Sequence, residues 1–387
     1  MVKILKYIVV TLLVIFAIIG DVKTAIGQDK VEENNKIKFA IETHSVWTPT
    51  FQLCWNELID LIGTPRVIYV DGNPELADKL NNQPFKKEDL SDSSYYISVT
   101  KMTQKHKKEI EKAIWDKFNE KSDILDKFDF ENVSDKKTNK WFIYSILLKN
   151  FKFHTPYKVL NSDYFNNGEK NKYKYFGFTK DQVDEKAKEI LENDYMENLF
   201  YVNDNDFALK IYNKDKTEQM ILYLTNSQES FDTIYNELLE KNRYKNDYIR
   251  ARAKEAAEKY GSFSKFKFHN YYKIPFMHID KTYNYDKELA NKPIKDKSYN
   301  STGHTWTILK TLQTIKFDMD NEGAKLKSEA GIAVMKNTAV QVPDAVINID
   351  NNYFFDRPFI IFLKETGKTR PYFAARVKNG KYLVKEQ

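Results

Sequence analysis

The chain has 387 residues, of which 42% are hydrophobic and 14% aromatic, and this is enough for a large core. Its formal net charge is only +6, with 61 basic and 55 acidic side chains, and this near balance argues against a nucleic-acid partner. The one cysteine, Cys54, excludes an internal disulfide framework, so we expect packing to stabilise the fold and the thiol to be buried rather than nucleophilic.

The N-terminus has the pattern of a signal peptide. Two lysines precede an apolar run at 7–19, which is shorter than the roughly 20 residues that span a bilayer, and small residues follow at 25–27. We therefore expect residues 1–27 to be removed and residues 28–387 to form one domain. The mature protein is expected to be a monomer outside the cell, or in a periplasm.

Helical spacing of apolar residues predicts four helices. They cover 48–63, 103–118, 231–239 and 248–260. Thr48 and Pro49 fit the cap and the first turn of the first helix, and Trp115 falls on the apolar side of the second. Residues 64–100 mix short apolar runs with turns and predict no definite element.

Strands are predicted mainly in the second half of the chain. They cover 141–148, 207–211, 220–224, 266–268, 315–319 and 359–363. The first is a continuous apolar run, as expected of a strand buried on both faces. The second and third flank turn-forming residues and predict a hairpin. Without regular alternation of strands and helices, the order predicts an α+β fold with largely antiparallel sheets.

The usual signatures of catalysis are missing from the sequence. It has no glycine-rich phosphate loop, no nucleophile elbow, no His-Glu-x-x-His and no paired cysteines. The six histidines are scattered, at positions 44, 106, 154, 269, 278 and 304. Asp318 and Asp320 would share the solvent face of a strand. We therefore expect no enzymatic activity, no metal and no cofactor.

A lysine-rich stretch begins just before the second predicted helix and continues into it. It contains Lys101, Lys105, Lys107, Lys108 and Lys112. Two glutamates are interleaved with these lysines, so we interpret the stretch as an ordinary solvated helix face. A sulfated polyanion is the weaker alternative.

The most specific pattern lies near the C-terminus. An aromatic run leads into Asp356-Arg357-Pro358-Phe359, an apolar strand, the turn Thr366-Gly367 and the run 373–377, which contains Arg376. A strand opened by proline, a glycine turn and a second strand predict a buried hairpin. The whole pattern resembles the signature of the serpin family, in which Asp356, Arg357, Pro358, Phe359 and Arg376 would be signature residues.

The resemblance implies a fold and a mechanism. The fold would be serpin-like α+β, with a large, mainly antiparallel sheet, surrounding helices and an exposed reactive-centre loop at about 331–350. In this family a protease cleaves the loop, which then enters the main sheet as a new strand and carries the acylated protease with it. The partner would be a serine or cysteine protease outside the cell.

Strand insertion makes a demand on the hinge, which can be checked in the sequence. Asn321-Glu322-Gly323 stands where the family has Glu-Glu-Gly. Residues entering a core at alternate positions must be small or apolar. The inward set is Ala324, Leu326, Ser328 and Ala330, continued by Ile332 and Val334. The family usually has Thr or Ser at the position of Ala324 and alanines over 326–329, so a non-inhibitory reading stays open.

The position of the cleaved bond is left open. Counting forward from Gly323 places it near Asn337-Thr338, and counting back from Asp356 places it near Ile347. Met335 and Lys336 lie between these limits. Lys336 would suit a trypsin-like protease and Met335 an elastase- or chymotrypsin-like one, but Lys336 can equally be read as a solvated loop residue.

Two fainter similarities to the family lie earlier in the chain. The segment 153–157 is similar to its Trp-x-x-Pro-Phe, and 48–50 to its Ser-Pro-x-Ser at the start of a helix. Two other functions remain as alternatives to inhibition. One is a non-inhibitory secreted binding protein on the same scaffold, and the other is an unrelated surface adhesin or sugar-binding protein.

Overall fold

The computed structural model describes eight stretches of the chain. They are residues 36–40, 45–63, 68–165, 170–182, 194–260, 266–295, 306–326 and 347–386. From Phe39 onward the described residues belong to one compact unit. The expected signal peptide, 1–27, lies outside these stretches. Within them, no helix is long and apolar enough to cross a membrane.

The largest sheet has six strands, all antiparallel to their neighbours. In spatial order they are β1 (Val46–Trp47), β19 (Phe373–Val377), β18 (Phe359–Glu365), β10 (Glu218–Leu224), β9 (Asp206–Tyr212) and β8 (Met196–Asn203). The central strands are buried on both faces. Tyr235 packs against Phe362 on one face, with 5.1 Å between ring centroids. The predicted 207–224 hairpin and the C-terminal hairpin are both confirmed here.

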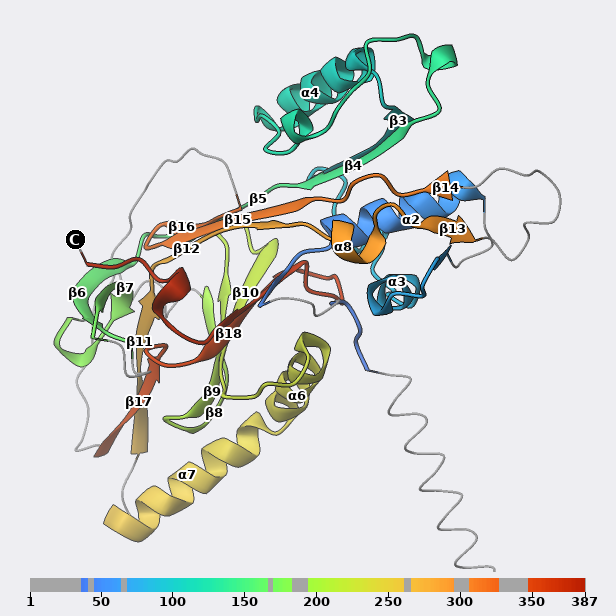
Figure 1. The fold of residues 1–387 in the computed structure, drawn as a ribbon. Helices are drawn as coiled ribbons and strands as arrows, with labels where there is room; N and C mark the ends of the chain where they lie inside the picture. Colours follow the sequence, from blue (N-terminus) through green and yellow to red (C-terminus); the bar gives the residue numbers. More distant parts are fainter. Residues whose placement is uncertain are drawn as a thin grey trace, which may run out of the picture. The chain divides into compact units, whose positions relative to one another are not determined.

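A second sheet has four strands. Its order is β12 (Met277–Tyr283), β15 (Gln313–Asp320), β16 (Gly323–Leu326) and β5 (Lys149–Lys152). Figure 1 shows these strands beside one another, with β5 continuing the line of β4 (Trp141–Leu147), which pairs with β3 (Tyr95–Lys101). Phe317 of β15 stacks on Phe373 of β19 at 4.6 Å, so the first two sheets share a core.

Two smaller sheets complete the strands of the described residues. One has the order β17 (Ile347–Phe354), β11 (Phe266–Pro275), β7 (Lys172–Phe178) and β6 (Lys158–Tyr164), and the other β14 (Trp306–Thr307), β13 (Pro293–Lys295) and β2 (Tyr69–Val70). Strands β11 and β17 run parallel, whereas the other paired strands run antiparallel. The predicted α+β class with mainly antiparallel sheets is confirmed.

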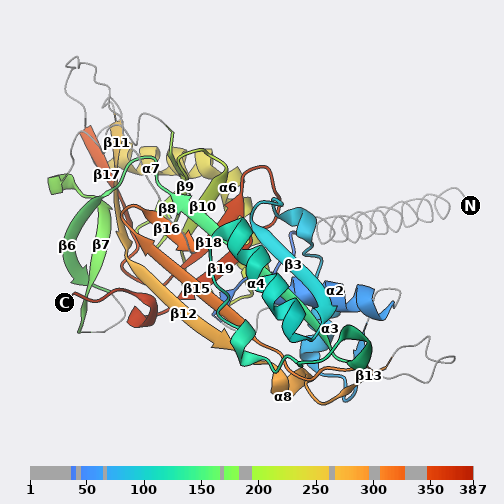
Figure 2. The ribbon, with the colours of Figure 1, turned by 90° about the horizontal axis from the view of Figure 1, so that it is seen from above.

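The described helices lie around these sheets (Figure 2). They are α2 (Thr50–Ile62), α3 (Glu75–Asn81), α4 (Gln104–Phe118), α6 (Phe231–Arg243), α7 (Lys245–Tyr260) and α8 (Asp286–Leu289). Short 3-10 turns occupy Lys87–Asp89, Leu125–Lys127, Asp135–Lys137, Lys180–Gln182 and Gly380–Tyr382. The four predicted helices are confirmed as α2, α4, α6 and α7, with ends moved by a few residues.

Several local expectations were wrong. Strand β4 is not buried on both faces, since Trp141 is exposed and burial alternates along the strand. Trp115 of α4 is 51% exposed, because Ile110 and Ile114 make the buried side of that helix. Thr48 does not cap α2. Residues 64–100 contain α3, β2 and β3.

Candidate functional site: an opening in the central sheet

Four of the predicted hinge residues, Gly323–Leu326, form strand β16 inside the sheet β12-β15-β16-β5. Strand β16 runs antiparallel to both neighbours, with Ala324 opposite Met319 of β15 on one side and Phe151 of β5 on the other. Ala324 is 1% exposed. It therefore occupies the inward position that the sequence pattern assigned to it.

Gly323 is required at its place by two features. Its φ is +153°, which side chains rarely adopt, and an added Cβ would lie 2.1 Å from the carbonyl oxygen of Phe151. The turn before it is closed by Asp320, whose Oδ1 accepts the backbone N–H groups of Glu322 (2.8 Å) and Gly323 (3.2 Å). Asp320 was expected only to face solvent, so this capping role was missed.

The turn is also tied to the segment that follows β5. Asn321 donates its side-chain amide to the carbonyl oxygen of Tyr157 (3.1 Å), and its own carbonyl accepts the backbone N–H of Tyr157 (2.8 Å). The carbonyl of Glu322 accepts the backbone N–H of Phe153 (3.0 Å). The segment 153–157, in which the sequence showed a faint family similarity, therefore anchors the hinge.

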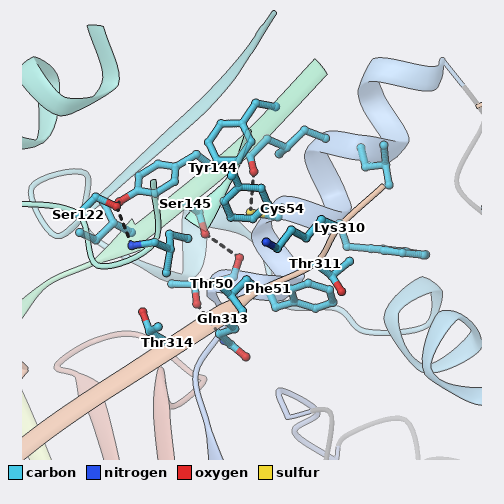
Figure 3. A pocket seen from close by; sticks show the side chains of 18 of the residues that line it. Thr50, Phe51, Cys54, Ser122, Tyr144, Ser145, Lys310, Thr311, Gln313 and Thr314 are labelled. Atoms are coloured by element: carbon cyan, nitrogen blue, oxygen red, sulfur yellow. Dashed lines mark hydrogen bonds between the residues drawn. The ribbon is translucent and has the colours of Figure 1, made fainter. Parts of the chain in front are cut away.

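Next to β16 the described strands leave two edges unpaired. Among the described residues, positions 313–317 of β15 pair only with β12, and β4 pairs only with β3. No strand of the described stretches therefore lies between the facing edges of β4 and β15. A cavity of about 500 Å³ lies there, and Figure 3 shows β4 and β15 on its two sides with α2 behind.

The N-terminus of α2 forms the inner wall of the cavity and is bonded to both strands. The side-chain amide of Gln313 in β15 donates to the hydroxyl oxygens of Thr48 (3.0 Å) and Thr50 (2.9 Å). On the other side, the hydroxyl of Ser145 in β4 donates to the carbonyl oxygen of Thr50 (2.6 Å). Thr48 thus links the helix to β15, in place of the capping role that the sequence predicted.

Cys54 lines the same cavity from α2. Its thiol lies 3.9 Å from the carbonyl oxygen of Ile143, and burial raises the pKa of this thiol to about 11. A thiol with so high a pKa is almost entirely protonated at neutral pH, and the thiolate is the nucleophilic form. The side chain is half-buried, so the expected full burial was wrong, while the raised pKa disfavours the nucleophilic thiolate.

A buried ionic cluster lies under the strand next to the hinge. Lys149 of β5, which is opposite Leu326 in register, places its ammonium 2.6 Å from Glu218 and also in contact with Glu365. Tyr372 donates its hydroxyl to Glu218 (2.6 Å), and Ser91 donates to Glu365 from both its backbone N–H and its hydroxyl (3.0 Å each). These contacts tie β5 to strands β10 and β18 behind it.

The environment sets the charges in this cluster. Burial alone would raise the pKa of Glu365, but hydrogen bonds from Lys149 and Ser91 outweigh it and hold that pKa below its ordinary value. Burial raises the pKa of Glu218 in spite of Lys149. The sequence offered one missed signal for this cluster, which is a lysine directly after the apolar run of β4.

The signature residues near the C-terminus hold the scaffold and do not meet at one site. Asp356 forms an ion pair with Lys273 of β11 (2.8 Å). The guanidinium of Arg357 donates a hydrogen bond to the carbonyl oxygen of Asp204 (3.1 Å). Pro358 directly precedes β18, which begins at the buried Phe359. Arg376 donates to the carbonyl oxygens of Gln228 (3.4 Å) and Glu229, just before α6.

The lysine-rich stretch is mostly engaged in local contacts. Lys101 lies 4.1 Å from the centre of the Trp141 ring, Lys105 pairs with Glu109 (3.8 Å), and Lys107 pairs with Asp126 (2.5 Å). Lys112 pairs with Asp116, while Lys108 is exposed. Within the described ranges, no group of three or more His, Cys, Asp or Glu side chains is placed to hold a metal ion.

Two predicted hinge residues and part of the predicted loop lie outside the described residues. These are Ser328 and Ala330 of the hinge, and Met335, Lys336, Asn337 and Thr338 of the loop. At the far end the loop was predicted to reach about residue 350, but its last four residues belong to β17, where Ile347 is paired with Phe266. The parallel pairing with β11 makes this end a strand, so the boundary was wrong there.

Comparison with known proteins found a similarity of structure. Neither a model of a known family nor a curated protein matches the sequence. Similar solved structures include Serpin48 of the insect Tenebrio molitor, with 13% identity, 90% of this chain and 93% of that one covered, and a TM-score of 0.36. A serpin of Schistosoma mansoni has 14% identity, 75% and 76% coverage and a TM-score of 0.36. Human thyroxine-binding globulin has 12% identity, 71% and 64% coverage and a TM-score of 0.35.

The solved structures found by comparison carry the name of the family that the C-terminal sequence pattern resembles or, for the globulin, another name, and membership of this chain in that family is an expectation from its sequence. At these identities and TM-scores, the likeness assigns no activity to this chain.

Proposed function

We propose that this protein is a secreted inhibitor of a serine or cysteine protease, which acts by loop cleavage and strand insertion. One observation carries the proposal. Strand β16 lies between β15 and β5, and next to it, among the described residues, no strand lies between the facing edges of β15 and β4, where the cavity is. This arrangement supports a continuation of β16 as a longer strand.

The register of β16 predicts how the strand would continue. Asp318 is opposite Lys325, so residues 327–330 would lie opposite residues 316–313 of β15. Ala330 would then face inward opposite Gln313, while Glu329 would face outward opposite Thr314, because residues opposite each other share a face. Only small side chains would enter the space beside α2.

The free energy gained by such insertion can be estimated. Four residues between two strands would form about eight backbone hydrogen bonds, each with a net contribution of about 0.5–1.5 kcal/mol. Insertion would therefore stabilise the cleaved protein by about 4–12 kcal/mol, before any apolar burial. A gain of this size is enough to drive a conformational change in a protein whose uncleaved state lacks the strand.

The proposal is tested with proteases in solution. The mature protein is incubated with trypsin-, elastase- and papain-like enzymes, followed by denaturing gels and thermal melts. A covalent complex, together with a large rise in melting temperature after cleavage, is the expected result. Cleavage that yields neither would refute strand insertion and favour the adhesin.

Two substitutions at neighbouring positions serve as a matched control. Ala330→Arg places a large cation on the inward face, so it should abolish both the complex and the rise in melting temperature. Glu329→Arg places the same side chain on the outward face and should leave both intact. Equal behaviour of the two variants would contradict the proposed register.

A non-inhibitory secreted binding protein is the second candidate. It is favoured by Ala324 at a position where inhibitory members of the family usually have Thr or Ser. A cavity of about 500 Å³ is also within the usual range of ligand sites. In the same experiment, this function would give a higher melting temperature after cleavage but no covalent complex.

A further inference from the structure

One wall of the cavity is apolar and only partly covered by the protein. It is made by large side chains of α2 and of the segment that begins with β14, which are Phe51, Leu58, Trp306 and Ile308. All four are partly buried, because they pack on one side against the apolar cluster around Trp55 and line the cavity as well. Apolar surface of this kind is favourable for an apolar ligand, which removes it from water.

The polar groups at the α2 wall are already bonded to one another. The side-chain amide of Gln313 donates to the hydroxyl oxygens of Thr48 and Thr50, and the carbonyl of Thr50 accepts the hydroxyl of Ser145. These groups therefore offer little to a polar ligand such as a sugar, which needs many hydrogen bonds. The wall favours a ligand with an apolar body.

The charged groups around the cavity favour an anion. The lining contains four lysines, at positions 121, 140, 310 and 316, and two acidic residues, at positions 120 and 123. Two of the lysines are neutralised by carboxylates, since Lys316 lies 3.0 Å from Asp123 and Lys140 lies 2.7 Å from Glu131. Lys310 has no carboxylate partner among the described residues, and its charge is thus available to a ligand.

Lys310 places its ammonium on the side of the cavity that lies away from α2. The ammonium donates to the carbonyl oxygen of Lys127 (2.5 Å) and lies 5.5 Å from the centre of the Phe128 ring. Phe128 packs on Phe142 of β4, three positions before Ser145, whose side chain bonds to α2 from the opposite face of the strand. Figure 3 shows the Lys310 side chain pointing across the cavity in the direction of β4. An ammonium has three donors, so two are left for a ligand.

We propose that the cavity binds one small amphipathic carboxylate, with its apolar chain along the α2 wall and its carboxylate at Lys310. The volume of about 500 Å³ is in the range of small-molecule sites. A single lysine is a point charge that suits one compact negative group, whereas arginine provides the paired contacts that favour phosphates. The inference concerns the uncleaved protein and goes beyond the proposed inhibition, on which it does not depend.

The chain and the head group of the ligand have separable effects on affinity. Burial of each further methylene should tighten binding about fourfold, so decanoate should bind about fifteenfold more tightly than octanoate. The charge contributes less, because Lys310 is exposed to solvent. Decanoate should therefore bind only about two- to fivefold more tightly than the uncharged decanol. High salt should reduce this preference and leave the dependence on chain length unchanged.

Binding is measured on the full mature chain without any protease, by titration calorimetry with octanoate, decanoate and decanol. Tryptophan fluorescence gives a second readout, since three of the five tryptophans, Trp55, Trp141 and Trp306, line the cavity. The rate at which iodoacetamide alkylates Cys54 locates the ligand, because this thiol lines the same cavity.

The variant that tests the head group is Lys310→Gln. Its matched control is Lys292→Gln, because Lys292 also donates to a backbone carbonyl, that of Glu288 (2.7 Å), but does not line the cavity. Lys310→Gln should bind decanoate and decanol equally, while Lys292→Gln should keep the two- to fivefold preference for decanoate.

In the unmodified protein, one decanoate per chain should bind, change the fluorescence and slow the alkylation of Cys54. A lack of saturable binding, or binding that leaves the alkylation rate unchanged, would overturn the site. A preference for decanoate that persists in Lys310→Gln would overturn the placement of the carboxylate. Since no protease is present, each of these results is independent of whether the protein inhibits one.

Discussion

The substitution Gly323→Ala tests whether β16 belongs to the sheet. The added Cβ would lie 2.1 Å from the carbonyl oxygen of Phe151 and 3.0 Å from the Cα of Lys152. Real Cβ atoms do not approach oxygen so closely, so the strands must separate by roughly 1 Å. A backbone N···O distance near 2.9 Å then becomes about 3.9 Å, which is no longer a hydrogen bond.

The cost can be worked out from the register. Four residue pairs join β16 to β5. An antiparallel stretch of this length has about four hydrogen bonds, so the substitution should destabilise the protein by about 2–6 kcal/mol. For roughly 350 folded residues the entropy of unfolding is about 0.7 kcal/mol per degree, and the melting temperature should fall by about 3–9 °C.

The assay is limited trypsin digestion with mass spectrometry, alongside the thermal melt. Lys325 is paired on both sides in β16, so trypsin should cut after it only in Gly323→Ala. Gly367→Ala is the control, because Gly367 also has a positive φ (+83°) but has nothing within 4 Å of an added Cβ. If Gly323→Ala melts like the unmodified protein and keeps Lys325 protected, the placement of the hinge in the sheet is refuted.

Other predictions concern the buried charges and the thiol. Because the pKa of Glu365 is lowered in the folded state, the stability it contributes is present above its unfolded pKa of about 4.3 and is lost as the pH falls through the folded value. Melting temperature should therefore fall below about pH 5, and less steeply in Glu365→Gln. Lys149→Met leaves two buried carboxylates without their cation, so it should cost about 3–5 kcal/mol at pH 7. A partial recovery of the melting temperature is expected at pH 5, and its absence would show that Lys149 acts by packing alone. Cys54 should react with iodoacetamide much more slowly than free cysteine at pH 8, and an equal rate would contradict its burial.

Two sets of ion pairs hold the strands around β16, and they differ in their exposure to solvent. Lys149 ties β5 to the six-stranded sheet through buried ion pairs, which are screened little by salt. Residues 120–128, which contact β4 through Ser122 and Phe128, are tied to β15 by the partly exposed Asp123–Lys316 pair. A higher salt concentration should thus weaken the attachment between β4 and β15, while β5 stays bound to the six-stranded sheet. Hydrogen exchange of β4 and β5 at two salt concentrations would separate these effects.

The sequence by itself determined the elements whose patterns are local. The spacing of apolar residues defined α2, α4, α6 and α7, because each helix buries one stripe of its own residues. The C-terminal hairpin was predictable because a proline, a glycine turn and two apolar runs lie within about 20 residues. Gly323 was singled out by the family resemblance and Ala324 by the alternation of small residues, and both lie in β16, while their role as a hinge stays a proposal.

Only the tertiary structure decided which residues meet across the opening. Lys149 and Glu365 are 216 positions apart, and Asp123 and Lys316 are almost as distant, so no local pattern links them. The two different faces of β4 also depend on its partners, because α2 contacts one face and residues 120–128 the other. Strand register and side-chain pairing are long-range properties. They depend on the packing of sheets and helices that are distant in the sequence, and not on the preferences of neighbouring residues.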